Sequence, residues 1–380
     1  MVKPNGEEAR MRNRVGTLLR IAALLVVAVL LGLAASCGGE EAAETTTPAE
    51  TEAPPAETEA PPAENAITKM AVVAPEKAND FGWNQQGVDG AQAAADSIGA
   101  ELLVADGAGY EDVTPILQQL ADDGAQFIIA QASGYNTAAP EFAAETGIPV
   151  ITYDKPDNTT PGLVADISTS SQQGAYLAGI LAASMSQTGV LGIVESADDT
   201  NWHKQSGGFV AGARSVNPDV EVIVTQIGQA GYADAAGGKR VTESVIAGGA
   251  DIVFGMGDGS SFGMLQAVET ATPPEGADKV WFIDVIGDKT SIDSKGVLLS
   301  SVLWDFTQIF EQALADLNAG TFGNQGYDLN VSNGLSLLQT PNIPADVWAE
   351  IETAAGGIAD GSIEIPLTPT LDDVNALIGG

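Results

Sequence analysis

The sequence predicts an α/β protein made of two doubly wound parallel-sheet lobes that are joined by a hinge. From residue 66 onward, short apolar runs alternate with amphipathic or Ala-rich segments, which is the pattern of repeated β–α units. The apolar runs are typical of strands that helices cover on both faces. The expected strands and helices are too many for one sheet of ordinary width, and 380 residues allow two domains.

The first half of the folded region is expected to alternate between residues 69 and 186. Short runs of Val, Ile, Leu, Phe and Ala predict strands at 69–74, 102–104, 127–130 and 148–152. Segments of helical spacing or Ala-rich composition predict helices at 85–98, 112–123, 138–146 and 171–186. Gly147 is the expected end of the third of these helices.

The second half continues the same alternation and gives the lobe boundaries. Strands are predicted at 190–194, 220–225, 252–254, 280–283 and 297–303, and helices at 208–215, 235–247, 261–270 and 307–318. We expect lobe one to comprise residues 66–168 with 285–335. We expect lobe two to comprise residues 169–284 with 336–380, and Gly-rich crossovers to serve as hinges.

The N-terminal region predicts a lipoprotein signal peptide, residues 1–36, and a tether. Five bases and two acids in this segment are combined with an apolar run at 21–33, which is short for a membrane span of about 20 residues. Small residues precede Cys37, the only Cys, and resemble a bacterial lipobox, so we expect Cys37 to be lipidated. An uncleaved anchor, or an ordinary signal peptide with a chance Cys, are the alternatives. Residues 37–65 are rich in Glu, Pro and Ala and predict a disordered acidic tether.

The composition favours a protein that binds a solute rather than one that catalyses a reaction. There are 51 acids against 15 bases, a net charge of −36, which argues against nucleic acid and against docking on anionic lipid by a basic patch. One Cys and one His exclude an internal disulfide framework and a zinc site with several thiolates, and disfavour His-based catalysis. We therefore expect no catalytic residues, no metal and no cofactor.

Loops that follow the predicted strands carry the candidate ligand-binding residues, because ligands of this fold class bind beyond the carboxyl ends of the strands. An aromatic ring beside a carboxylate and an amide suits a small, flat, polar ligand. Alternatively, the Trp of the first loop closes the core, and its Asp or Asn caps the next helix. The candidates in this loop are Asp80, Phe81, Trp83 and Asn84.

Further candidates follow later strands. Tyr153 and Asp154 follow the fourth strand, and Trp202 is a candidate second stacking wall. His203 is a candidate donor to the ligand or, alternatively, a surface or helix-start residue. No catalytic arrangement surrounds it.

A Gly-rich turn and a predicted strand end complete the candidate set. Gly257 and Asp258 follow a strand, but the turn lacks the spacing of a phosphate-binding loop. Two interpretations of this turn remain. Its backbone N–H groups face a sugar hydroxyl or a base edge of the ligand, or it is simply a tight turn. Asp284, at the end of a predicted strand, is a candidate acceptor for a ribose diol or an exposed carboxylate.

Several motifs, in order between about residues 70 and 366, resemble the basic membrane protein family of ABC-transporter substrate-binding lipoproteins. The resemblance implies the type I periplasmic-binding-protein fold. The matching stretches are Asp-Phe-Gly-Trp-Asn at 80–84, Gly-Ala-Tyr-Leu-Ala-Gly at 174–179, Gly-Gly-Phe-Val-Ala-Gly-Ala at 207–213, Val-Asn-Pro-Asp at 216–219, 234–239, and Gly-Ala-Asp-Ile-Val-Phe at 249–254.

The resemblance also implies a function and residue roles. It implies an extracytoplasmic protein, monomeric and held to the membrane by its lipid, that binds a purine nucleoside or nucleobase for an ABC permease. Trp83 and Asn84 would contact the base, Trp202 would lie opposite, and Asp284 would hold the ribose. Trp304 stands where the family's nucleoside receptors have a Lys, which makes a free base or another flat or sugar-like solute a competitor.

Two other classes of function are weighed against this interpretation. One is a sensor that presents its ligand-bound form to a membrane signalling partner. The other is an enzyme such as a nucleoside hydrolase, but the first loop lacks the D-x-D-x-x-x-D-D spacing of such a calcium site.

Overall fold

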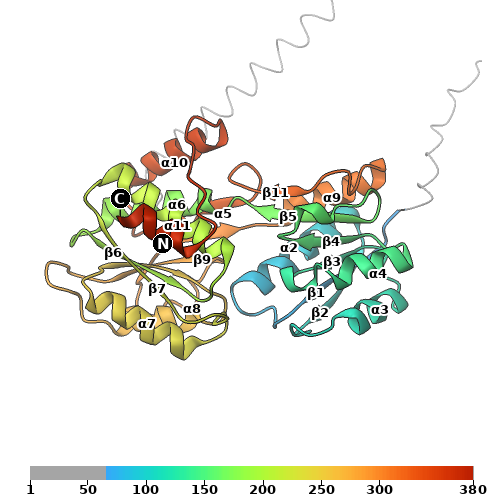
Figure 1. Cartoon of the computed structure of the whole chain (residues 1–380), viewed down its shortest axis with the longest axis horizontal. Helices are drawn as coiled ribbons and strands as arrows, with labels where there is room; N and C mark the ends of the chain where they lie inside the picture. The colour runs from blue at the N-terminus through green and yellow to red at the C-terminus, as the bar shows by residue number, and fades with distance from the viewer. Residues whose placement is uncertain (1–65, 380) are drawn as a thin grey trace, which may run out of the picture. The chain divides into compact units, whose positions relative to one another are not determined.

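Two six-stranded sheets dominate the computed structural model, which describes residues 66–379 (Figure 1). Each sheet carries helices on both faces, so the predicted two-lobe α/β class is confirmed. The predicted signal peptide, the tether and Cys37 lie outside the described residues.

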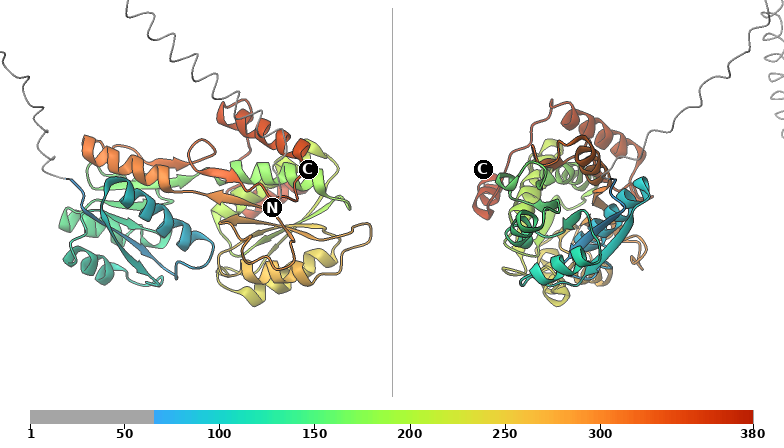
Figure 2. Two further views of the ribbon diagram at one scale, coloured as in Figure 1. Left: turned by 180° about the vertical axis from the view of Figure 1, so that it is seen from behind. Right: turned by 90° about the vertical axis from the view of Figure 1, so that its right-hand side faces the viewer.

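The sheet of lobe one is parallel throughout, with the strand order β11-β5-β4-β3-β1-β2. Its strands are β1 (Lys69–Ala74), β2 (Glu101–Asp106), β3 (Ile128–Ala130), β4 (Val150–Tyr153), β5 (Val164–Thr169) and β11 (Tyr327–Leu329). Helices α2 (Trp83–Ile98) and α9 (Thr307–Ala319) pack together on one face, and α3 (Thr114–Asp122) and α4 (Ala138–Thr146) on the other (Figure 2).

Strand β1 shows why this region reads as a continuous apolar run. Met70 and Val72 belong to the core beneath α2, whereas Ala71 and Val73 belong to the core beneath α3 and α4. All four side chains are fully buried. Because successive side chains of a strand point to opposite faces, burial on both faces demands apolar residues at every position.

The sheet of lobe two has the order β12-β10-β9-β8-β6-β7 and is parallel except that β12 runs antiparallel to β10. Its strands are β6 (Val190–Glu195), β7 (Glu221–Gln226), β8 (Ile252–Met256), β9 (Trp281–Ile286), β10 (Leu298–Trp304) and β12 (Leu335–Leu337). Helices α5 (Ser171–Met185) and α6 (Thr200–Val216) cover one face, and α7 (Ala235–Ala247) and α8 (Ser261–Thr270) the other. Helix α10 (Ala345–Ala359) packs on α5, and α11 (Leu371–Gly379) packs on α6.

The chain crosses between the lobes three times, after β5, after β10 and after β11. The second crossing corrects the expected boundary at residue 285, because β10 pairs with β9 and so residues 285–304 belong to lobe two. The crossovers are hydrogen-bonded to one another: Ser170 N donates to Leu329 O at 2.9 Å, and Asp305 N donates to Gly334 O at 2.9 Å. They are not Gly-rich as expected, since Gly334 is the one glycine in residues 169–171, 304–307 and 329–335.

Two element boundaries differ from the prediction in a way that matters for the site. Helix α6 begins at Thr200, eight residues before the predicted start at 208, and Asp199 caps it by accepting from Asn201 N at 2.7 Å. The polar residues of its first two turns hid the helical periodicity. Strand β9 extends to Ile286, so Asp284 lies within a strand and not at its end.

Helices α5 and α6 approach closely because glycines stand where they cross. A Cβ on Gly179 of α5 would lie 2.1 Å from the carbonyl oxygen of Phe209, and a Cβ on Gly208 of α6 would lie 2.3 Å from that of Gln172. Real Cβ atoms do not approach a backbone oxygen so closely. Gly179 of the 174–179 motif and Gly208 of the 207–213 motif are therefore required by backbone packing.

We expect Gly179→Ala to destabilise the protein by about 1–3 kcal/mol, because the new methyl group forces two backbones apart. Gly356→Ala in α10 is the matched control, since a Cβ there meets nothing within 4 Å and Ala favours a helix by about 1 kcal/mol over Gly. Urea unfolding of the two purified variants measures both effects. Equal stability of the two variants would contradict this account of the α5–α6 contact.

Candidate functional site

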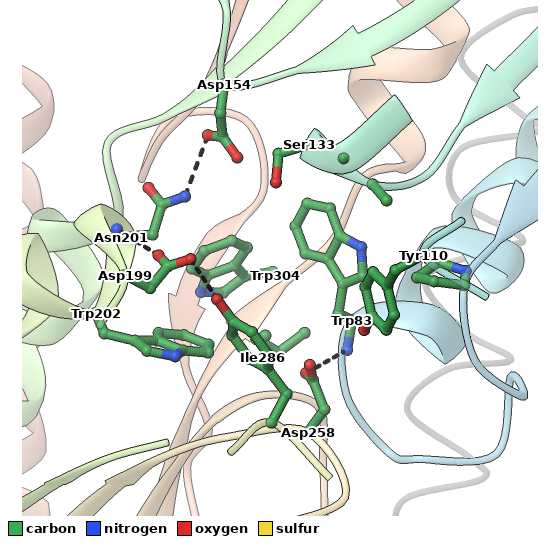
Figure 3. A pocket seen from close by; sticks show the side chains of 14 residues that line it. Trp83, Tyr110, Ser133, Asp154, Asp199, Asn201, Trp202, Asp258, Ile286 and Trp304 are labelled. Atoms are coloured by element: carbon green, nitrogen blue, oxygen red, sulfur yellow. Dashed lines mark hydrogen bonds between the residues drawn. The ribbon is translucent and has the colours of Figure 1, made fainter. Parts of the chain in front are cut away.

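A cavity of about 290 Å³ lies where residues of both lobes meet (Figure 3). Every lining residue follows, or ends, a strand of one of the two parallel sheets. Its lining consists of Pro75, Trp83, Tyr110, Ala132, Ser133, Gly134, Asp154, Asp199, Asn201, Trp202, Tyr232, Asp258, Ile286 and Trp304. The cavity thus occupies the place at which ligands bind in folds of this class.

Lobe one contributes residues that follow four of its strands. Trp83 begins α2 after β1, Tyr110 follows β2, Ser133 follows β3, and Asp154 follows β4. Asp154 has a positive φ of 60°, a conformation that Asp adopts more readily than most residues. This turn places its carboxylate at the cavity.

Lobe two contributes residues that follow or end five of its strands. Asp199, Asn201 and Trp202 form the start of α6 after β6. Tyr232 follows β7 and Asp258 follows β8. The last residues of the next two strands complete this wall, and they are Ile286 of β9 and Trp304 of β10.

The three indoles of the cavity differ in how their N–H groups are used. Trp83 Nε1 donates to Gln131 O at 2.8 Å, and Trp202 Nε1 donates to Ser196 Oγ at 3.0 Å. Trp304 Nε1 has no partner, although the side chain is only 1% exposed. A buried donor without a partner is costly, and Trp304 Nε1 is such an unsatisfied donor on a residue of the cavity wall.

Three predicted site residues hold Trp83 in place without lining the cavity. The Asp80 carboxylate accepts from Gly82 N, from Asn84 N and from Asn84 Nδ2, at 3.0, 3.1 and 2.7 Å. Asn84 Oδ1 accepts from the backbone N of Glu76 at 3.1 Å. The buried Tyr153 ring packs edge-on against Trp83 at 5.0 Å. These contacts fit the alternative in which Asp80 and Asn84 stabilise the start of the helix.

Phe81 and Asp284 belong to a buried contact between the lobes. Lys289 Nζ donates to the carbonyl oxygen of Phe81 at 2.8 Å and forms an ion pair with Asp284 at 2.7 Å. The side chains of Lys289 and Asp284 are fully buried, and Ser261 Oγ also donates to Asp284, at 2.9 Å. Asp284 therefore does not face the cavity, and its position does not suit the expected ribose contact. Phe81 does not line the cavity either, and its ring packs against Phe262.

His203 and Gly257 also lie outside the cavity lining. His203 is 2% exposed, and its ring nitrogens lie 3.2 Å from Glu195 and 2.9 Å from Asp198. Burial alone would lower the pKa of His203, but the two carboxylates raise it to about 9, so the imidazole is a positively charged structural group in lobe two. A Cβ on Gly257 would lie 2.0 Å from Ser260 Oγ, so this glycine allows the tight turn that was its alternative interpretation.

Three carboxylates face the cavity, and each accepts a hydrogen bond. Asn201 Nδ2 donates to Asp154 at 3.1 Å, the Tyr232 hydroxyl donates to Asp199 at 2.9 Å, and Trp83 N donates to Asp258 at 3.3 Å. Burial raises the pKa of Asp258 to about 8, and it raises that of Asp154 to about 6. No Lys, Arg or His is among the lining residues.

Several lining residues were not predicted individually, and their position after strands is the signal they share. The rule that ligands bind beyond the carboxyl ends of parallel strands points to each of them, but the choice within each loop depends on the turn. The unpredicted polar and aromatic residues are Tyr110, Ser133, Asp199, Asn201 and Tyr232.

The arrangement can bind a solute by stacking and by accepting hydrogen bonds.

Among residues 66–379, no group of three or more His, Cys, Asp or Glu side chains is placed to hold a metal ion. No helix in that range combines the length and apolar character that a membrane span requires.

Comparison with known proteins gives relatives along most of the chain. The ABC transporter nucleoside-binding protein BmpA of Lactococcus lactis subsp. cremoris is 26% identical over an alignment of 377 positions that covers 94% of this chain and 99% of that protein. The transcriptional activator protein med of Bacillus subtilis is 23% identical and covers 70% of this chain and 80% of its own length. A solved ABC transporter solute-binding protein from Aeropyrum pernix has the same fold, with a TM-score of 0.67 at 18% identity over 82% of this chain and 96% of its own.

The family described as ABC transporter substrate-binding protein PnrA-like matches residues 67–342, which include both sheets and all of the cavity lining. This range is more than half of the chain. The chain belongs to the Bmp family of PnrA-like ABC transporter substrate-binding proteins.

Proposed function

We propose that this protein is an extracytoplasmic lipoprotein that binds a purine nucleoside or nucleobase in the cavity and delivers it to an ABC permease. The observation that carries the proposal is a cavity with aromatic rings and hydrogen-bonding groups from both lobes. A volume of about 290 Å³ is at the lower end for ligand pockets and suits a small solute. The likeness to a relative named as nucleoside-binding supports the choice of ligand class.

In this proposal the solute is recognised both by stacking on aromatic rings and by hydrogen bonds to polar side chains. Trp83 from lobe one and Trp202 from lobe two offer ring faces for a flat base. Asp154 and Asp258 accept from ring N–H, amino or ribose hydroxyl groups. The unpartnered Trp304 Nε1 donates to a ring nitrogen or carbonyl oxygen of the base.

Binding by both lobes couples the solute to hinge closure. A solute that contacts Trp83 and Trp202 together stabilises the conformation in which the lobes approach, and this differential affinity shifts the equilibrium towards it. The three crossovers between the lobes are the hinge in this proposal. The permease would then recognise the solute-bound conformation.

The N-terminal sequence supplies the proposed anchor. A basic and apolar leader precedes Cys37, and an acidic Pro-containing tether follows it. Lipidation of Cys37 would hold the two lobes near the permease.

A second candidate function is a sensor that signals the presence of the solute. It is favoured by the likeness to a relative named as a transcriptional activator. Both functions use the same cavity, so they differ only in whether the solute-bound protein meets a permease or a signalling partner.

Trp83→Ala and Trp202→Ala are each expected to weaken binding at least tenfold, about 1–3 kcal/mol, because each removes one stacking face. Calorimetry with adenosine, guanosine, inosine and adenine measures the effect. Trp348→Ala in α10 is the control, since Trp348 is partly exposed and does not line the cavity. Unchanged affinity in both cavity variants would reject stacking between two walls.

Cys37→Ser is expected to move the protein from the membrane fraction to the soluble extracytoplasmic fraction, because the thiol that carries the lipid is lost. Fractionation, together with incorporation of labelled fatty acid, measures this change. A Ser variant that stays in the membrane fraction would favour an uncleaved anchor.

If the protein serves an importer, deletion of its gene is expected to reduce the uptake of a radiolabelled nucleoside by the cells several-fold. Restoring the wild-type chain should restore uptake, whereas Trp83→Ala should not. Normal uptake combined with a lost transcriptional response to the nucleoside would instead establish the sensor.

A further inference from the structure

We propose that the cavity selects a flat organic cation, so that among purine nucleosides it prefers one whose ring carries a positive charge. The inference rests on the proposed function in that the same cavity holds the solute. It goes further, because a purine nucleoside in its common form is neutral at pH 7.

The charges around the cavity are unbalanced. Asp154, Asp199 and Asp258 line it, and no base does. Two lysines lie near: Lys289 pairs with Asp284, and Lys204, whose Nζ donates to the carbonyl oxygen of Thr169 at 2.8 Å, offsets only part of the charge of Asp154 and Asp199. A neutral solute would leave the negative charge of Asp154 and Asp199 without a full counter-charge and would keep the buried Asp258 protonated, whereas a cation compensates this charge.

The aromatic lining suits a cation as well. Five rings face the cavity, those of Trp83, Tyr110, Trp202, Tyr232 and Trp304. A cation over the face of Trp or Tyr is attracted by the ring quadrupole, most strongly where water is excluded. The indole N–H groups of Trp83 and Trp202 are bonded to protein, so these two rings contribute π-surface to the cavity lining and no free donor.

The carboxylates keep acceptor capacity on both sides of the solute. Both oxygens of Asp199 are already used, one by Asn201 N and the other by the Tyr232 hydroxyl. Asp154 and Asp258 each accept through one oxygen, so the other oxygen of each remains for the solute. Asp154 belongs to lobe one and Asp258 to lobe two. A cation bound between them therefore attracts both lobes.

The unpartnered Trp304 Nε1 points to a second requirement. This donor is buried in the cavity wall, and a simple alkylammonium ion has no acceptor for it. A ring nitrogen, a carbonyl oxygen or a hydroxyl does. The favoured solute therefore combines a positive charge with a hydrogen-bond acceptor, as a cationic heteroaromatic ring or nucleoside does.

The protonation of Asp258 supplies a measurable consequence. Burial, together with the nearby carboxylates of Asp80 and Glu76, raises the pKa of Asp258 to about 8, and Trp83 N and Lys289 oppose the rise. At pH 7 the free protein therefore holds Asp258 mostly protonated. A bound cation favours the carboxylate, so its binding releases a proton near pH 7 and strengthens as the pH rises towards 8.

The test compares two isomers that differ in charge, using the whole purified protein. 1-Methyladenosine is a cation at pH 7, and N6-methyladenosine has the same composition but is neutral. Calorimetry at pH 7, in two buffers of different ionisation enthalpy, gives the affinity and the protons released. We expect at least tenfold tighter binding of 1-methyladenosine, with proton release that the neutral isomer does not cause.

Variants separate the charge effect from the position of the methyl group. Asp258→Asn and Asp154→Asn are expected to reduce the preference for the cation at least fivefold, and Asp258→Asn should also abolish most of the proton release. Asp219→Asn, at an exposed position outside the cavity, is the matched control. Because the two cavity variants lie in different lobes, misfolding of one leaves the other as a test.

The outcomes distinguish this inference from the proposed function. Equal binding of the two isomers, or tighter binding of the neutral one, overturns the cation preference and leaves purine binding standing. A third compound, benzyltrimethylammonium, is an aromatic cation without a hydrogen-bond acceptor. If it binds and neither nucleoside does, the cation preference stands, whereas purine binding and the need for an acceptor are rejected. A failure of all three compounds to bind rejects both.

Discussion

The parallel order of the strands is the constraint on which the site depends. In a parallel sheet the carboxyl ends of all strands lie along the same edge. The loops that follow these strands are therefore brought together by the sheet, even where they are far apart in the sequence. Trp83 and Asp154 meet in this way in lobe one, and Trp202 and Asp258 do so in lobe two. The antiparallel strand β12 pairs only with β10, at the outer edge of its sheet. It therefore does not disturb the loops that meet at the carboxyl ends of the parallel strands.

Two buried carboxylates behind the cavity wall are paired with basic side chains, whereas the carboxylates that line the cavity are not. Behind the wall, Asp284 is neutralised by Lys289, which also binds the backbone of the other lobe, and Glu195 and Asp198 are matched by His203. Inside the cavity, Asp154 and Asp258 have hydrogen bonds but no base. Burial raises the pKa of both residues, so the folded protein disfavours their ionised forms. Such frustration is typical of a binding site that a ligand relieves.

The sequence predicted the architecture well because burial on both faces leaves a strong signal. Strand β1 and helices α4, α7 and α8 have the predicted bounds. The prediction failed where polar residues interrupt an element, as in the first turns of α6, and it missed short edge strands such as β11 and β12. Within the candidate site, Trp83, Trp202 and Trp304 line the cavity, whereas Asp80 and Asn84 do not. The sequence shows which loop a polar residue belongs to, but the turn decides whether its side chain faces the backbone or the ligand.

The last residue of β10 connects the fold to the choice of solute. It is Trp304, packed edge-on against Trp83 at 6.1 Å. A Lys at this place would add a positive charge to a cavity with three carboxylates, whereas Trp304 adds a ring face and a single N–H donor. The positive charge that the protein does not supply is then best supplied by the solute. Because the same ring packs against Phe306 at the crossover after β10, the residue that changes the charge balance also lies next to the hinge.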